Sequence, residues 1–299
     1  MCTYNGSRFL GEQLASIAAQ DYPDWRLVVS DDGSTDGTLG VLDKWPSPPH
    51  LPPVVVVHGP GKGFVANFLS FVTCPSVVAE YYAFADQDDI WETDKLSRAV
   101  AWLDTIDPSV PALYCSRTRL VDSDNQEIGL SPLFAKKPGF ANALVQCIAG
   151  GNTMLFNEAA RRLSAASGVT TEVVSHDWWL YLIVTGCGGR AHYDPYPTMR
   201  YRQHTGNLVG SNSGWRSRFD RVQQLFRGNF RAWSDRQVAA LGKIESRLTP
   251  ENRKLFRLYA FARQQSLLPR VAGLIRCGVY RQTLFSNLGL LAAAIFKKI

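Results

Sequence analysis

The sequence predicts an α/β fold: a mostly parallel, doubly wound sheet flanked by helices and followed by a C-terminal helical region. In the first half, apolar runs typical of strands alternate with helical patterns, and acidic clusters follow two of these runs. The charge also changes along the chain. Residues 1–214 carry 15 Lys and Arg against 22 Asp and Glu, a net of −7, whereas residues 215–299 carry 17 against 4, a net of +13. An acidic body with a basic tail indicates two parts with separate tasks.

The order of elements is justified by hydrophobic periodicity. Leu10, Leu14 and Ile17 share one face of a first helix, and the continuous β-branched run Val54–Val57 is typical of a strand covered on both faces. The alternating order predicts parallel strands joined by crossover helices. The other predicted strands are Trp25–Ser30, Tyr81–Ala85, Ala112–Val121 and Asn152–Phe156. Four more helices are predicted. One carries Leu39 and Leu42, a second runs over Phe64–Val72, a third begins at Thr93, and a fourth runs over Asp177–Val184.

The beginning of the chain lacks an expected element. Met1-Cys2-Thr3-Tyr4-Asn5-Gly6 reads as the end of a strand and a turn, without the apolar residues that should lead into it. An absent central strand would leave neighbouring backbone groups unpaired. Either the first strand is very short, or the true start lies upstream of Met1; of the two, we expect a truncated first strand.

Composition sets further bounds. With 299 residues and 45% hydrophobic side chains, the chain can bury a sizeable core. Its six cysteines lie far apart and form no C-x-x-C pair, so they indicate neither a zinc site nor a disulfide framework and favour a reducing cytoplasm. No signal peptide is visible, and no apolar run reaches the ~18 residues of a membrane span. We expect a cytoplasmic protein.

The acidic cluster Asp86-Gln87-Asp88-Asp89 follows the predicted strand Tyr81–Ala85. Open α/β sheets bind ligands at the carboxyl ends of their strands. Carboxylates this close repel one another unless a cation or a donor-rich partner lies among them, and their oxygens suit Mg²⁺ or Mn²⁺. The alternative is a solvated acidic turn, since Asp-rich turns are common.

Two more polar clusters follow predicted strands. Thr3-Tyr4-Asn5 comes after the first and Asp32 after the second. A carboxylate can accept a hydrogen bond from N3–H of uracil or thymine, and a tyrosine ring can stack on the base. By itself, Asp31-Asp32-Gly33-Ser34 is also an ordinary turn. Three such clusters in the expected order favour a nucleotide site.

Several motifs, in order, resemble the family 2 glycosyltransferases with a GT-A, Rossmann-like fold, most closely their bacterial rhamnosyltransferase-like branch. The resemblance covers roughly residues 1–212, so we expect a GT-A domain over 1–212 and a basic amphipathic helical region over 213–299. The motifs are Thr3-Tyr4-Asn5-Gly6, Ser30-Asp31-Asp32-Gly33-Ser34-Thr35-Asp36, Phe84-Ala85-Asp86-Gln87-Asp88-Asp89-Ile90-Trp91, Gly151-Asn152-Thr153-Met154-Leu155-Phe156-Asn157, His176-Asp177-Trp178 and Tyr201-Arg202-Gln203-His204-Thr205-Gly206-Asn207.

This resemblance implies an inverting, metal-dependent transfer of a single sugar, with rhamnose as a candidate. The donor would be a nucleoside-diphosphate sugar. The acceptor would be a glycan or lipid-linked glycan in bacterial cell-surface polysaccharide synthesis. The cofactor would be Mg²⁺ or Mn²⁺.

The resemblance also implies roles for individual residues. Asp177 would be the general base that deprotonates the acceptor hydroxyl. Without the resemblance, an Asp at a helix N-terminus is better explained by capping, and a lone His is more often structural. The residues implied to bind the nucleotide sugar are Thr3, Tyr4, Asn5, Asp32, Asp86 and Asp88, and those implied to bind the metal are Asp88, Asp86 and His204.

Two other functions stay open at this stage. A sugar-phosphate nucleotidyltransferase also uses a doubly wound sheet, but the sequence lacks its glycine-rich, arginine-containing amino-terminal loop. A non-catalytic sugar-binding scaffold derived from a transferase is opposed by the full set Asp32, Asp86, Asp88 and Asp177.

The basic tail interleaves cations with bulky apolar residues. Such a pattern fits amphipathic helices on an anionic membrane surface, and predicts peripheral attachment to the inner face of the plasma membrane. The alternative is a helical subdomain packed on the catalytic domain with solvated arginines. No nucleic-acid-binding module is recognised, so no nucleic acid is expected. The residues are Arg216, Arg218, Phe219, Arg221, Leu225, Phe226, Arg227, Phe230, Arg231 and Trp233, followed by Leu255, Leu258, Phe261, Leu267, Leu268 and Leu274.

Overall fold

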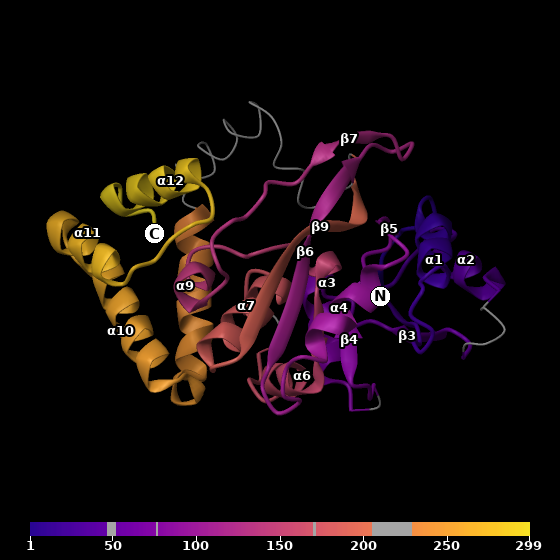
Figure 1. Ribbon diagram of the computed structural model, residues 1–299, viewed down its shortest axis with the longest axis horizontal. Coiled ribbons are helices and arrows are strands. Elements are labelled where there is room, and N and C mark those ends of the chain that lie inside the picture. Colours follow the sequence, from indigo (N-terminus) through magenta and orange to yellow (C-terminus); the bar gives the residue numbers. More distant parts are fainter. Residues whose placement is uncertain (47–51, 76, 170–171, 205–228) are drawn as a thin grey trace.

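The computed structural model describes residues 1–46, 52–75, 77–169, 172–204 and 229–299 (Figure 1). Its strands are β1 (Cys2–Thr3), β2 (Val28–Asp31), β3 (Val55–His58), β4 (Tyr81–Ala83), β5 (Ile90–Trp91), β6 (Ala112–Val121), β7 (Glu127–Leu130), β8 (Leu155–Asn157) and β9 (Arg190–Arg202). Its α-helices are α1 (Leu10–Ala18), α2 (Thr38–Lys44), α3 (Phe64–Thr73), α4 (Lys95–Leu103), α5 (Phe140–Ala143), α6 (Glu158–Ala165), α7 (His176–Gly186), α9 (Asn229–Lys243), α10 (Pro250–Gln264), α11 (Leu267–Arg276) and α12 (Leu284–Ile295).

The strands form two sheets that meet near the start of the chain. β1, β2 and β3 make a parallel sheet, and the second sheet has the order β4-β8-β6-β9-β5 with β7 beside β6. A hydrogen bond from Cys2 N to Ala85 O, 3.2 Å long, joins them. The predicted α/β class is confirmed. The expected parallel pairing holds for the first sheet, whereas the second is mixed: β6 and β9 run parallel, and β8 runs antiparallel to both of its neighbours.

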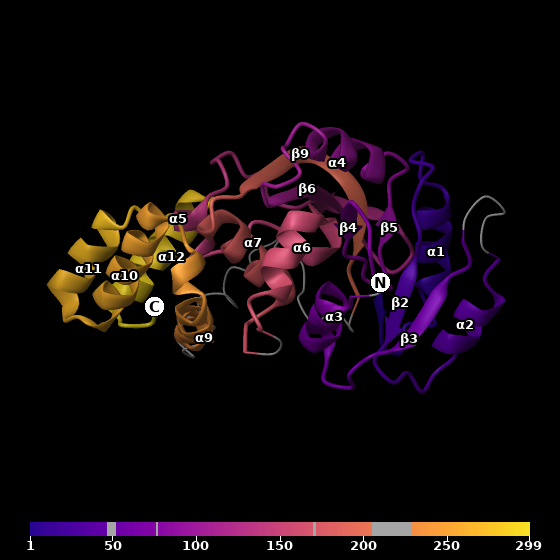
Figure 2. The same ribbon diagram turned by 90° about the horizontal axis from the view of Figure 1, so that it is seen from below.

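Helices cover both faces of the second sheet. In Figure 2, α4 lies on one side of β6 and β9, and α6 and α7 lie on the other. Most of α7 is buried, with Trp179 and Tyr181 fully inside the core. Because α7 is packed on nearly every side, the first turn of the helix has a fixed position.

Strand β3 differs from its expected environment. The Val54–Val57 run does form a strand, but the expectation that it is covered on both faces was wrong, because Val55, Val56 and Val57 are 52%, 43% and 40% exposed. In the part of the chain that is described, β3 pairs with β2 alone and is therefore an edge strand. At the other edge of this sheet, β1 comprises two residues, and the amino group of Met1 donates to Val28 O at 2.8 Å.

The C-terminal helices pack on the part of the chain that contains the second sheet and α7. Tyr259 Oη of α10 donates to Leu144 O at 3.3 Å, and Asn252 Nδ2 donates to Gly186 O at 3.0 Å. The packed helical subdomain is thus present, and lipid contact stays a prediction. Among the described helices, none is long and apolar enough to cross a bilayer. Several tail residues of the sequence pattern lie outside the described residues: Arg216, Arg218, Phe219, Arg221, Leu225, Phe226 and Arg227.

Candidate active site

The acidic cluster lies in the loop between β4 and β5, and its carboxylates face different ways. Asp86 and Asp88 are half-buried, whereas Asp89 is fully buried and accepts a hydrogen bond from Asn152 Nδ2 at 2.7 Å. Burial raises the pKa of Asp89, and the charges of Asp88 and Asp86 add to the effect. Asp89 therefore belongs to the core of the loop. Asp86 and Asp88 are the members that can meet a ligand.

A buried lysine lies beneath this loop. Lys95 is fully buried, and its Nζ donates to Asn152 O at 2.8 Å. Burial lowers the pKa of Lys95 to about 7, against the opposing attraction of Asp89 and Asp86. Lys95 and Asp89 thus place opposite charges in the same dry region, which offsets part of the cost of burying each.

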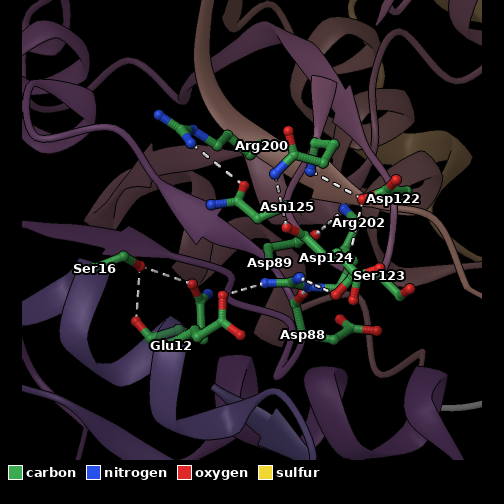
Figure 3. Close-up of polar contacts among 12 residues, drawn as sticks. Glu12, Ser16, Asp88, Asp89, Asp122, Ser123, Asp124, Asn125, Arg200 and Arg202 are labelled. Atoms are coloured by element: carbon green, nitrogen blue, oxygen red, sulfur yellow. Dashed lines mark hydrogen bonds and ion pairs between the residues drawn. The ribbon is translucent and has the colours of Figure 1, made fainter. Parts of the chain in front are cut away.

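Arg202, the last residue of β9, holds the acidic loop in place (Figure 3). Its side chain is fully buried, and its Nε donates to Asp88 O at 3.0 Å. Its two terminal nitrogens donate to Ser123 O and Glu12 Oε2, each at 2.8 Å. One guanidinium therefore ties α1, the acidic loop and the loop after β6 together. The sequence motif contained Arg202, but sequence reasoning gave it no role.

His204 follows the end of β9 by two residues and lies beside Asp88 of the acidic loop. His204 Nε2 lies 2.8 Å from Asp88 Oδ2, and the imidazole packs on the ring of Phe9 with centroids 4.9 Å apart. The motif continues through Thr205-Gly206-Asn207, which lie outside the described residues.

Asp177 is fixed at the first turn of α7. Its Oδ2 accepts a hydrogen bond from Gly151 N at 3.0 Å, and its Oδ1 accepts one from Trp178 N at 2.7 Å. Burial, together with the nearby carboxylates of Asp88 and Asp177, raises the pKa of Asp86 to about 7. Carboxylates from the acidic loop and α7 therefore share one site, where they repel one another until a cation or proton intervenes.

The residue before Asp177 is a buried histidine, His176. His176 stacks on Phe68 with ring centroids 4.0 Å apart and meets Phe84 edge-on at 4.6 Å. Among the described residues, neither ring nitrogen of His176 has a hydrogen-bond partner. A Cβ added at Gly151 would lie 2.3 Å from His176 Nε2, so a side chain does not fit at Gly151. The backbone of Gly151 thus packs closely against the ring of His176 while its N–H donates to the carboxylate of Asp177.

Replacing Gly151 by alanine is expected to lower turnover by ~10- to 100-fold, because the new Cβ must displace His176 and with it Asp177, and misplacement of about 1 Å can cost 10²-fold. Steady-state kinetics with a nucleotide-sugar donor would measure this. Gly242→Ala is the matched control, because Gly242 lies in α9 with no atom near its added Cβ. Equal activity of the two variants would contradict the proposed tight fit at Gly151.

His176 also predicts a dependence of stability on pH. Burial lowers the pKa of His176 to about 4 from its usual 6.5. Between these values the unfolded chain binds a proton that the folded chain does not, so stability is full above pH 6.5 and falls as the pH drops toward 4. The slope for one group is at most about 1.4 kcal/mol per pH unit. His176→Gln should flatten urea-unfolding stability over this window, and an unchanged slope would rule the histidine out as its source.

The residues of the first sheet that the sequence predicts to bind a nucleotide have distinct environments. Thr3 is buried, and its hydroxyl donates to Asp31 Oδ2 at 2.8 Å, so it supports the turn after β2. Hydrogen bonds outweigh burial and lower the pKa of Asp31. Asp32 is half-buried and accepts from Gly61 N at 2.7 Å and Gly63 N at 2.8 Å. Asp32 therefore holds the glycine loop while keeping lone pairs for a ligand.

Tyr4 is the exposed member of this group. Its side chain is 58% exposed. Its backbone N donates to Gln87 Oε1 at 2.8 Å, and its backbone O accepts from Gln87 Nε2 at 3.0 Å. Asn5 has a φ of 48°, and its Oδ1 accepts from Thr35 N at 2.8 Å. The backbone of Tyr4 is thus tied to the acidic loop and its ring is free to stack on a flat group. Gln87 is a positioning residue that sequence reasoning missed.

The donor set fits a hard divalent cation in part. Asp88 and His204 already lie within hydrogen-bond distance and could bind one ion together. In the described part of the chain, no group of three or more His, Cys, Asp or Glu side chains is arranged around one point. Mg²⁺ commonly uses one or two protein ligands together with substrate phosphates and water, so a two-ligand site is sufficient.

A parallel sheet followed by a mixed sheet, with an acidic loop between β4 and β5 and Asp177 in the first turn of α7, agrees with a glycosyltransferase of the GT-A type. The chain belongs to glycosyl transferase family 2, whose model matches residues 1–163, more than half of the chain. The predicted family and enzyme class are confirmed, and they decide against the nucleotidyltransferase.

Relatives agree with this assignment. The chain is 32% identical over 234 residues to the dTDP-rhamnosyl transferase RfbG of Shigella flexneri, covering 74% of this chain and 78% of that protein. It is 32% identical over 105 residues to the poly(ribitol-phosphate) β-N-acetylglucosaminyltransferase TarS of Staphylococcus aureus, covering 34% of this chain and 18% of TarS.

Solved structures show the same fold. The mannosyltransferase PcManGT of Pyrobaculum calidifontis, in complex with GDP-Man and Mn²⁺, has a TM-score of 0.53 at 21% identity, covering 99% of this chain and 84% of that one. TarS residues 1–349 in complex with UDP-GlcNAc has a TM-score of 0.53 at 18% identity, covering 99% and 86%.

Proposed function

We propose that the protein catalyses inverting transfer of a single sugar from a nucleoside-diphosphate donor to a glycan or lipid-linked glycan acceptor. The observation that carries this proposal is that Asp177 and the acidic loop meet at neighbouring residues: Gly151 N donates to Asp177 at 3.0 Å, and Asn152 Nδ2 donates to Asp89 at 2.7 Å. Such a site can bind a donor on the acidic loop and leave a carboxylate on the other side for the acceptor.

Asp177 is proposed as the general base. It accepts the proton of the acceptor hydroxyl while that oxygen attacks the anomeric carbon, and the bond from this carbon to the diphosphate oxygen breaks. The new glycosidic bond forms on the opposite face of the sugar, which gives inversion. The N–H groups of Gly151 and Trp178 hold the carboxylate of Asp177 in one orientation throughout.

The donor is proposed to lie along the strand ends. Tyr4 would stack on the base, Asp32 would accept from its N3–H, and Asp86 would lie near the ribose. Thr3 and Asn5 support this region through the turn after β2. Mg²⁺ or Mn²⁺, held by Asp88 and His204 with Asp86 nearby, would neutralise charge on the departing diphosphate.

A deoxythymidine-diphosphate rhamnose donor is proposed from the relationship to RfbG, whose name gives it that class of donor. The test is a panel of nucleotide sugars in a thermal-shift assay with Mn²⁺, followed by donor hydrolysis without acceptor. A ligand that binds the folded state raises the melting temperature by mass action. We expect the thymidine-linked rhamnose to give the largest shift. A larger shift with a uridine-linked hexose would reassign the donor, and no shift with any donor would overturn the proposal.

The place of action is proposed to be the cytoplasm, at the inner face of the plasma membrane. A lipid-linked acceptor in cell-surface polysaccharide synthesis would lie there, and the basic C-terminal region would be attracted to its anionic lipids.

A further inference from the structure

Helix α12 is apolar on its outer face as well as its inner face. Leu290, Ala293 and Ala294 face the core. On the other side, Leu284, Leu288, Leu291 and Ile295 follow one another at helical spacing and are 74%, 55%, 44% and 43% exposed. A helix that is hydrophobic all round is normally covered on all sides, by protein or by lipid.

The helix is well anchored despite this exposure. Thr283 and Ser286 form a capping box at its N-terminus. At its C-terminus, the buried guanidinium of Arg270 donates to Ala294 O at 2.6 Å and Ile295 O at 3.2 Å. Because both ends are satisfied and α11 packs beside it, the outer face of α12 is presented in a fixed orientation. Figure 1 shows α11 and α12 at the end of the molecule opposite the β1–β3 sheet.

The part of the sequence that contains this face is rich in cations. Residues 252–299 contain nine Lys and Arg and no Asp or Glu. Lys297 and Lys298 directly follow α12, and Arg276 ends the neighbouring α11. Within the described part of the chain, none of these three forms an ion pair with a carboxylate. Uncompensated cations beside an apolar stripe complement an anionic surface with an apolar interior.

We propose that the outer face of α12, defined as Leu284, Leu288, Leu291 and Ile295, lies in the interfacial region of an anionic bilayer and holds the enzyme on it. The helix has 12 residues, about 18 Å at 1.5 Å per residue, so it lies in the membrane plane and does not span the ~30 Å core. A second copy of the chain fits less well, because pairing these faces would bring like charges together. The proposal deepens the proposed function by naming the surface that meets the membrane.

The test uses the full chain and sedimentation with vesicles of phosphatidylcholine, with or without phosphatidylglycerol. The wild type should bind the anionic vesicles, and Leu288→Ser with Leu291→Ser should weaken that binding by ~10-fold or more. The matched control is Ile128→Ser with Leu130→Ser, which alters exposed apolar residues on β7 and should bind as the wild type does. Lys297→Gln with Lys298→Gln should lose up to about 30-fold on anionic vesicles at low salt and little on neutral ones.

Several results would overturn the proposal that the outer face of α12 binds the membrane. They are absence of wild-type binding to anionic vesicles, equal binding by the α12 variant, or a wild-type dimer that the α12 variant converts to monomer. Thermal melting of each variant checks that it is folded. Donor hydrolysis should be unchanged in the α12 variants, since the helix lies away from the active site. Loss of hydrolysis in every form with vesicle binding intact would instead refute the proposed function and leave the surface standing.

Discussion

Replacing Asp177 by asparagine is expected to abolish sugar transfer while leaving donor affinity nearly intact. The amide cannot accept the acceptor proton, and loss of a general base typically costs ~10²–10⁴ in rate. The fold should survive, because asparagine keeps the shape and one oxygen to accept from Gly151 N or Trp178 N. Turnover and donor binding, measured separately by product formation and calorimetry, give the two quantities.

The matched control is Asp24→Asn, which changes an exposed carboxylate that has no role in the proposed site. It should leave both quantities unchanged. Near-normal turnover by the Asp177 variant would assign the base to another carboxylate, and Asp86 would then be the next residue to test.

Asp88→Asn is expected to remove metal-dependent donor binding while the fold is retained. Losing even a hydrogen-bonding partner of a metal ligand costs 10–100-fold in affinity, so losing a charged ligand should cost at least ~10²-fold. Affinity for a nucleoside diphosphate, measured with and without Mn²⁺, reports this. If the Mn²⁺-dependent part of the affinity were the same in variant and wild type, Asp88 would not be the ligand.

Asp89→Asn tests whether Asp89 stabilises the acidic loop without binding the metal. Asp89 is buried against Asn152 and near the charge of Lys95, so its replacement should lower the melting temperature and spare the Mn²⁺ response. The opposite pattern, with a normal melting temperature and a lost metal response, would exchange the roles of Asp88 and Asp89.

Local patterns predicted the parts of the site that are local in sequence. The strand Ala112–Val121 was predicted with the bounds that β6 has, and the acidic loop does follow a strand. These features depend on the side chains of one segment, which hydrophobic periodicity can show. The positions of Asp32 and Asp177 at a strand end and a helix start followed from the same kind of signal.

Features that depend on distant pairing were missed. The long strand β9 was not predicted, because Pro195 and Pro197 argue against a strand. In the structure a register shift between Ser116 and Arg117 of β6 accommodates this segment, and Tyr196 N bonds to Asp194 Oδ1 at 2.9 Å. For β3, the valines could not show whether the strand is central or at an edge, because that depends on neighbours elsewhere in the chain.

The bonds of Arg202 have a consequence for how the protein is made. Asp88 O and Arg202 Nε are separated by 114 residues, and Glu12 and Arg202 by 190. At a synthesis rate of ~5–20 residues per second, roughly 6–23 s pass between the emergence of the acidic loop and the arrival of its arginine. During this interval the loop carries its negative charges without that partner. Nascent chains stalled between the two positions should therefore be protease-sensitive at the loop, and become resistant once Arg202 has left the ribosome.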